Sequence, residues 1–243
     1  MITLAKKLIT CSGTTEVNGY VEFVSSTPMT ITPKYTNSGV TLRYSLDGIT
    51  WTPIVSGVTT PSANIIYFIG RAAGTKSLYT ANSSSNAWAF SGATNLECNG
   101  KLDRLLQYNL GGDNDILTIG ANCFNYMFYN ATTLIKAPEL PATTLANYCY
   151  NEMFSGCTSL ITAPILPATV LANSCYSTMF NGCTKIKMSK TMTGIYDTSY
   201  RIPTSGTGTL AANALTDMFL GTGGTFKGTP TINEIYYTEN TPV

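Results

Sequence analysis

The chain has 243 residues, of which 11% are charged, and its 14 Lys and Arg against 13 Asp and Glu give a formal net charge of +1. An ordinary soluble domain has roughly 25% charged residues, and a nucleic-acid-binding surface needs clustered Lys and Arg, so this composition excludes an electrostatic nucleic-acid binder. Histidine is absent, which removes the commonest general base and the commonest transition-metal ligand.

The first ten residues, MITLAKKLIT, contain two lysines but no apolar run long enough for a secretory signal. No stretch approaches the ~20 apolar residues that span a bilayer. We therefore expect neither an export signal nor membrane insertion. The first dozen residues are predicted to be an anchoring arm or, equally, an edge strand.

The region up to about residue 80 has the alternating apolar pattern of short β-strands. In TLRYSLDGITWTPI, Asp47 and Gly48 separate two alternating runs, which is a strong hairpin signal. VEFV, MTITPKY and IIYFIGRA supply further strands. The spacing predicts a small immunoglobulin-like β-sandwich over residues 1–82, although no Cys-Trp-Cys pattern is present. By analogy, such a module attaches or spaces other modules.

GGDNDILTIG places Asp113 and Asp115 in a Gly-rich turn. Calcium would need more oxygen ligands, and in an EF-hand a Glu at loop position twelve. A solvated turn is therefore predicted, with a calcium site as the alternative.

The sequence repeats itself after residue 83. Met-Phe pairs begin at Met127, Met153 and Met179, 26 residues apart, and a fourth at Met218 follows one unit plus a 13-residue insertion. AFSGATNL at 89–96 matches MFSGCTSL at 153–160. These copies give about five units, and the two atypical ones lie at the ends, where repeats must cap a stack.

The sequence of each unit predicts a short helix, a turn, a short strand and a second turn. In the unit from Thr143, apolar residues four apart predict a helix with Thr143 as its N-cap, and CTSLITAP predicts a strand bounded by Pro164 and Pro167. One position accepts only Gly or Asn, which indicates a left-handed helix end at Gly92, Asn130, Gly156, Gly182 and Gly221. Because one coil cannot bury enough apolar surface to offset its ordering entropy, the coils must stack.

The cysteines follow the repeat. Two registers hold five of the seven, and Ala or Thr replaces cysteine in other units: Cys123, Cys149, Cys175 and Ala214 in one, Ala131, Cys157, Cys183 and Thr222 in the other. Free substitution by small residues indicates packing, and the within-unit spacing of eight differs from the Cys-x-x-Cys of metal sites. Buried free thiols are predicted, with a disulfide or a metal site as alternatives; no cofactor or metal is expected.

CYNEMFSGCTSLITAPILPATVLAN and its copies, roughly residues 87–226, resemble the BspA-like leucine-rich repeat family. The Ala-Pro-x-Leu-Pro-Ala-Thr-x-Leu variant is similar to repeats in proteins of gut bacteria and their phages, including crAss-like phages. The resemblance implies an adhesin or surface-binding protein with no catalytic centre. The expected fold class is α+β: a β-sandwich over 1–82, a leucine-rich-repeat solenoid of 26-residue coils over 83–226 and a capping strand within 227–243.

The predicted helix has a solvent face whose residues vary between units. We expect it to be either inert surface or a ligand-contacting surface, and Tyr with Asn would suit carbohydrate. The candidate contact residues are Asn147, Tyr148, Asn151, Glu152, Asn173 and Ser174.

These observations favour a non-enzymatic structural protein of a bacteriophage virion, as a head fibre, capsid decoration or tail appendage. The N-terminal domain would contact other virion proteins, and the repeats would adhere to host-surface carbohydrate or mucus. Such a chain would be made in the host cytoplasm, act on the exterior of the capsid or tail, and form a homo-oligomer, for which a trimer is only a guess. The alternative is a bacterial cell-surface leucine-rich-repeat adhesin; an enzyme is disfavoured because no histidine can activate a nucleophile.

Overall fold

The computed structural model describes residues 10–11, 15–16, 19–74, 76–107 and 117–239. The described chain is rich in β-structure and contains two larger mixed sheets, of seven and four strands. A two-stranded antiparallel pair, β1 (Thr10–Cys11) with β2 (Thr15–Glu16), lies at the start. Its described helices are two short 3-10 turns, η1 (Ser84–Asn86) and η2 (Leu102–Leu105), and none has the length and apolarity to cross a bilayer.

The seven-stranded sheet has the order β5-β4-β6-β3-β8-β9, with β7 paired to the second part of β3. All pairs are antiparallel except β8 with β9. The strands are β3 (Val21–Thr32), β4 (Val40–Ser45), β5 (Thr52–Ile54), β6 (Ala63–Ala72), β7 (Ala89–Ser91), β8 (Leu96–Asn99) and β9 (Leu134–Lys136).

The predicted hairpin is confirmed as β4 and β5. Asp47 organises the connection, because its Oδ1 accepts hydrogen bonds from the backbone N–H groups of Ile49 (2.8 Å) and Thr50 (2.7 Å). Gly48 has φ +70°, a conformation that glycine adopts without steric cost. These hydrogen bonds hold the pKa of the Asp47 carboxyl well below its ordinary value.

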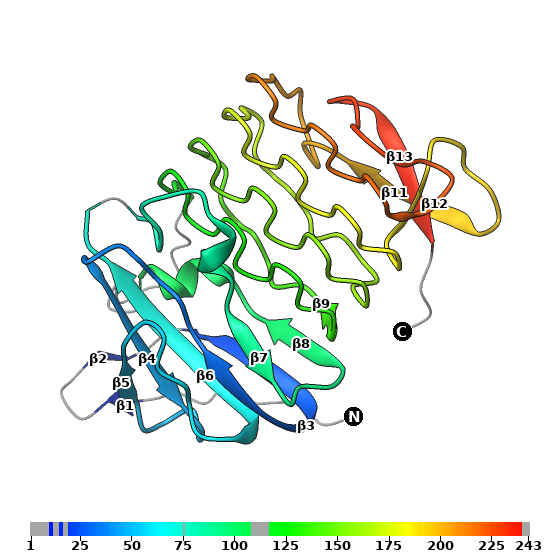
Figure 1. The fold of residues 1–243 in the computed structure, drawn as a ribbon. Helices are drawn as coiled ribbons and strands as arrows, with labels where there is room; N and C mark the ends of the chain where they lie inside the picture. The colour runs from blue at the N-terminus through cyan, green and yellow to red at the C-terminus, as the bar shows by residue number, and fades with distance from the viewer. Residues whose placement is uncertain (1–9, 12–14, 17–18, 75, 108–116, 240–243) are drawn as a thin grey trace.

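The expected immunoglobulin-like sandwich is not confirmed, since β3, β4, β5 and β6 of this region pair into one sheet and the short strands β1 and β2 pair with each other. β7 and β8, which lie beyond the expected boundary at residue 82, hydrogen-bond to β3 inside that sheet. The hydrophobic core is also continuous from Val21 to Tyr236. Strand pairing therefore joins the N-terminal strands to the repeats (Figure 1).

The predicted helices are wrong. The segments 121–130, 147–156, 173–182 and 212–221 are successions of turns, and each has a positive φ at every fourth residue. The four coils that begin with these segments are numbered one to four below, in chain order. In the second coil these residues are Tyr148 (φ +58°), Glu152 (+50°) and Gly156 (+76°). A residue with positive φ interrupts an α-helix, so the apolar period of four belongs here to a chain of turns. The left-handed geometry predicted for Asn130, Gly156 and their equivalents is confirmed, as the last member of each series.

Backbone hydrogen bonds in these turns alternate between two directions. Every second N–H closes a turn within its own coil, as from Met153 to Tyr150 O (3.3 Å). The intervening N–H groups donate to the next coil, as from Phe154 to Met179 O (3.0 Å). The turns of neighbouring coils are therefore tied by a ladder of backbone bonds, much as strands are in a sheet.

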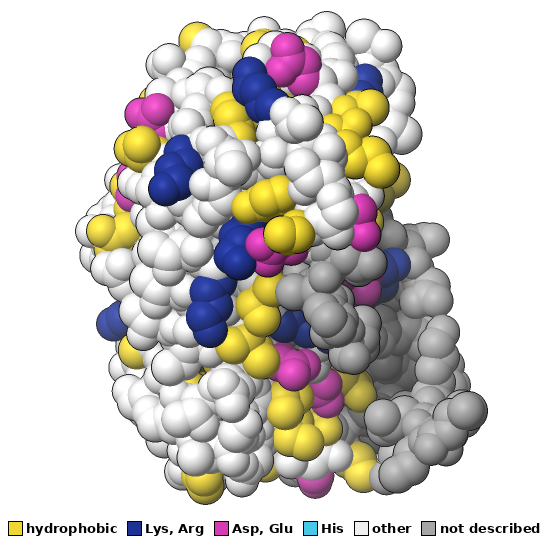
Figure 2. All heavy atoms as spheres, turned by 90° about the vertical axis from the view of Figure 1, so that its right-hand side faces the viewer, with side chains coloured by type: hydrophobic (Ala, Val, Ile, Leu, Met, Phe, Trp, Pro, Cys, Tyr) yellow, Lys and Arg dark blue, Asp and Glu magenta, His cyan; other side chains and the backbone are white. Residues whose placement is uncertain are grey.

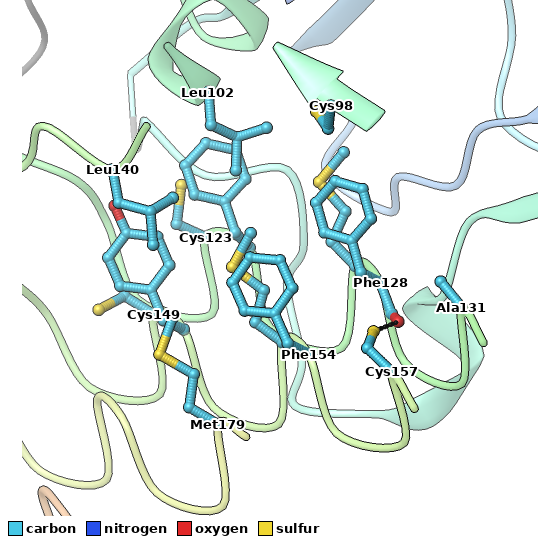
Figure 3. Packing of buried hydrophobic residues seen from close by; sticks show 14 of the residues in the cluster. Cys98, Leu102, Cys123, Phe128, Ala131, Leu140, Cys149, Phe154, Cys157 and Met179 are labelled. Carbon is cyan, nitrogen blue, oxygen red and sulfur yellow. Dashed lines mark hydrogen bonds between the residues drawn. The ribbon is translucent and has the colours of Figure 1, made fainter. Parts of the chain in front are cut away.

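Equivalent side chains lie on top of one another in the core. Ring centroids of Phe128 and Phe154 are 5.3 Å apart with planes at 14°, and those of Phe154 and Phe180 are 5.7 Å apart at 3°. Phe90 and Phe219 extend this row at either end. Figure 3 shows Phe128 and Phe154 in this arrangement, with Cys157 beside them. The predicted equivalent placement of these phenylalanines is confirmed, including Phe90 and Phe219 of the atypical first and last copies, although the first copy forms β7 in place of a turn series.

The strand expected after each turn series forms in some units only. It is β9 in the first coil, β10 (Lys187–Ser189) in the third and β12 (Gly223–Gly224) in the fourth, whereas residues 160–164 of the second coil are not a strand. The insertion contains β11 (Tyr196–Arg201), and the C-terminal segment provides β13 (Ile235–Glu239). The order β11-β13-β10-β12 places the predicted C-terminal strand inside the second sheet.

Candidate binding surface

The turn series places polar side chains at the surface. We call the accessible ones among the candidate residues, Asn147, Tyr148, Glu152 and Asn173, the rim. Of the six candidate contact residues, Asn147 is exposed and Tyr148 is 37% exposed, while Glu152 and Asn173 are half-buried. Asn151 and Ser174 are buried, so their assignment to the solvent face was wrong. The error follows from assuming a helix, because residues in these turns do not follow the exposure pattern of a 3.6-residue period.

Asn151 and Ser174 make structural contacts instead. The Asn151 Nδ2 donates to Ser177 O in the next coil at 3.1 Å. The Ser174 hydroxyl donates to Asn173 Oδ1 at 2.8 Å. These two side chains stabilise the turns, and Asn147, Tyr148, Glu152 and Asn173 remain available at the rim.

Two tyrosines of the first coil add to this rim. The Tyr126 hydroxyl donates to Glu152 Oε1 at 2.7 Å, and the Tyr126 ring makes an edge contact with Tyr129 at 5.3 Å between centroids. Desolvation, and secondarily the bond to Glu152, raise the pKa of Tyr126 well above its ordinary value. Tyr126 and Glu152 occupy the same register one unit apart, which is the signal that could have identified this pair from the sequence.

Sequence reasoning also missed a groove between the first two coils. It encloses about 340 Å³ and is lined by residues 137–141 together with Pro164, Ile165 and Pro167. Lys101 and Glu139 form a parallel bridge, but the described residues contain no equivalent bridge between Glu139 and Ile165, one coil further on. Because proline has no backbone N–H, prolines at matching positions in both coils disfavour closure of the ladder here.

The groove is mostly apolar. Glu139 is its one charged lining residue and is exposed. Pro164 and Pro167 were interpreted from the sequence as strand boundaries. Pro138 and Pro141 occupy the same positions in the preceding coil, and this repetition of prolines indicates a gap between the coils. The groove has the size of a small-molecule or side-chain pocket.

The prediction of buried free thiols is confirmed for the six described cysteine side chains. The thiols of Cys157 and Cys183 each donate to a carbonyl of the preceding coil at 3.0 Å, from Sγ to Phe128 O and Phe154 O; Figure 3 marks the first of these bonds. Burial raises the pKa of Cys175 and of Cys183 to about 12. Such thiols are protonated at neutral pH and inaccessible, so they are poor nucleophiles.

The described part of the chain contains no cluster of three or more His, Cys, Asp or Glu side chains suited to a metal ion. Asp113 and Asp115, the candidates for a calcium site or a solvated turn, lie outside the described residues. In Figure 2, basic and acidic side chains are interspersed with hydrophobic ones over the visible face. The described residues on this face therefore form no large surface of a single charge.

Comparison of the chain with protein-family models, with curated proteins and with solved structures gives no match.

Proposed function

We propose that the chain is a non-enzymatic structural protein of a bacteriophage virion, and that its repeats form a short leucine-rich-repeat solenoid displayed on the exterior of the particle. The observation that carries the proposal is the stack of equivalent coils, tied by backbone ladders and a row of stacked phenylalanines. A stack of this kind holds its surface residues in fixed relative positions, which suits a binding scaffold.

The ligand class that this rim favours is carbohydrate on the host surface or in mucus. Tyr126, Tyr129 and Tyr148 offer aromatic faces at the surface, and Glu152 and Asn147 offer hydrogen-bonding groups. The low share of charged residues, 11% of the chain, agrees with recognition of neutral sugars through hydrogen bonds and apolar contacts. The strands that precede the repeats would attach the chain to other virion proteins.

Two experiments test this function separately. Mass spectrometry of purified virions should detect the chain as a stoichiometric component; its absence from virions and presence in a bacterial surface fraction would favour the cell-surface adhesin instead.

Binding to mucin-coated sensors should weaken by roughly tenfold in Tyr148→Ala. The matched control is Tyr196→Ala on β11, outside the rim, and equal binding by both variants would remove the rim from the proposal.

A further inference from the structure

The groove between the first two coils, which we call the proline groove, lies where one step of the backbone ladder is missing. On the other side of the first coil the step is complete. Glu139 N–H donates to Gly100 O at 2.9 Å, and Leu102 N–H donates to Glu139 O at 3.1 Å. Glu139 thereby forms its parallel bridge with Lys101. The residue equivalent to Glu139 in the second coil is Ile165, which lines the groove without forming this bridge.

The first coil therefore presents an acceptor and a donor to the groove. They are the carbonyl of Pro138 and the N–H of Leu140, which flank Glu139 as Gly100 and Leu102 flank Lys101. Neither group has a hydrogen-bond partner among the described residues. Their spacing is the one that a single residue of a parallel extended chain needs for its own N–H and carbonyl.

The second coil shows that a carbonyl at this position can take a donor. Pro164 O, the counterpart of Pro138 O, accepts from the Tyr200 hydroxyl at 3.2 Å. Ile165 on the same wall is 67% exposed, so its apolar surface is left uncovered. The volume of about 340 Å³ lies within the range of ligand pockets, roughly 300–1,000 Å³.

The segment that already pairs with Glu139 indicates which side chains fit beside it. Lys101 stands in register with Glu139, and its neighbour Leu102 is fully buried. Successive side chains of an extended chain point to opposite faces, so this order places a basic group beside Glu139 and an apolar group inside.

The charge of the groove favours the same order. Glu139 is the one charged lining residue, and no ion pair joins its carboxylate to a described residue. A basic residue in register with Glu139 would meet this carboxylate from the side of the groove. The residues before and after it would point towards Pro138 and Leu140, which are both buried.

We propose that the proline groove binds an extended peptide segment of a partner protein, in which a Lys or Arg is flanked by apolar residues. The basic residue donates its N–H to Pro138 O and accepts from Leu140 N–H, so that the segment supplies the missing step of the ladder. Its cationic side chain lies beside Glu139, and its apolar neighbours cover the prolines.

NMR titration of the full chain with a blocked peptide tests the site. The probe is acetyl-Gly-Leu-Lys-Leu-Gly-amide, whose ends carry no charge. We expect saturable shifts of the Leu140 and Ile165 amides, with a Kd in the millimolar range. A probe methylated on the lysine backbone nitrogen cannot donate to Pro138 O and should bind at least roughly fivefold more weakly. The absence of saturable shifts at both amides, or equal binding of the two probes, would overturn the proposal.

Charge-reversed probes and matched variants test the role of Glu139. Replacing the lysine of the probe by glutamate should weaken binding to the unchanged chain by at least about threefold. Glu139→Gln should bind both probes equally, whereas Glu97→Gln removes the same charge outside the groove and should still discriminate between them. Discrimination that persists in Glu139→Gln or disappears in Glu97→Gln would refute the proposed placement of the basic residue. These titrations involve neither the rim nor virions, so their failure would leave the proposed function standing.

Discussion

Replacement of Phe154 by alanine tests the stacked core directly. Its ring is fully buried and lies between Phe128 and Phe180, at 5.3 and 5.7 Å between centroids. Because the flanking coils are tied by backbone bonds, the site cannot collapse fully, so Phe154→Ala should destabilise the chain by about 3–5 kcal/mol. That is a large part of the about 5–15 kcal/mol by which a folded domain is stable. Phe154→Leu retains most of the volume and should cost only about 1–1.5 kcal/mol.

Urea unfolding of single and double variants separates ring stacking from simple loss of volume. Alanine at both Phe154 and Phe180, whose rings are adjacent and within 3° of parallel, should show a coupling energy of about 0.5–1.5 kcal/mol. Phe128 and Phe219 do not contact each other in the row, and their double variant should be additive within about 0.5 kcal/mol. A cost below about 1 kcal/mol for Phe154→Ala, or equal coupling in the two pairs, would refute the ladder as a source of stability.

Three further predictions concern backbone strain and thiol burial. At Gly156 (φ +76°) an added Cβ would collide with the Asn130 side chain, whereas at Gly182 (φ +73°) its nearest neighbour would be a Gly156 atom at an ordinary 3.8 Å. Gly182→Ala should therefore cost about 1–2 kcal/mol in urea unfolding, and Gly156→Ala distinctly more; equal costs would contradict the packing. Asn130→Gly should be nearly neutral, because glycine adopts φ +57° freely, while Asn130→Val should cost more than about 1 kcal/mol. Burial raises the pKa of Cys175 from 9.0 to about 12, so the thiol favours the folded state below pH 9 and this contribution is lost as pH rises from 9 towards 12. Unfolding measured between pH 8 and 10.5 should depend less on pH in Cys175→Ala than in the unchanged chain, and identical slopes would exclude this linkage.

The sequence alone was enough to predict the repeat and the positions that are equivalent between its units. The 26-residue spacing of Met127, Met153 and Met179 predicted side chains in equivalent environments, and all three are fully buried. The alternation of Gly and Asn at one position predicted positive φ, since those residues adopt it at the least cost. Substitution of Cys149 by Ala in another unit correctly indicated a packing role for the thiols.

Only the tertiary structure decided what joins the coils. An apolar period of four residues is shared by an α-helix and by a chain of turns with positive φ at every fourth residue, so Asn151 and Ser174 were misplaced at the surface. The turn conformation prevails where each second N–H finds its acceptor in the next coil, 25 residues away, as from Phe154 to Met179 O. A short stretch of sequence around Phe154 does not include Met179, so local sequence alone cannot reveal this hydrogen bond. The proline groove depends likewise on which backbone groups meet across coils, and that is settled when the coils stack.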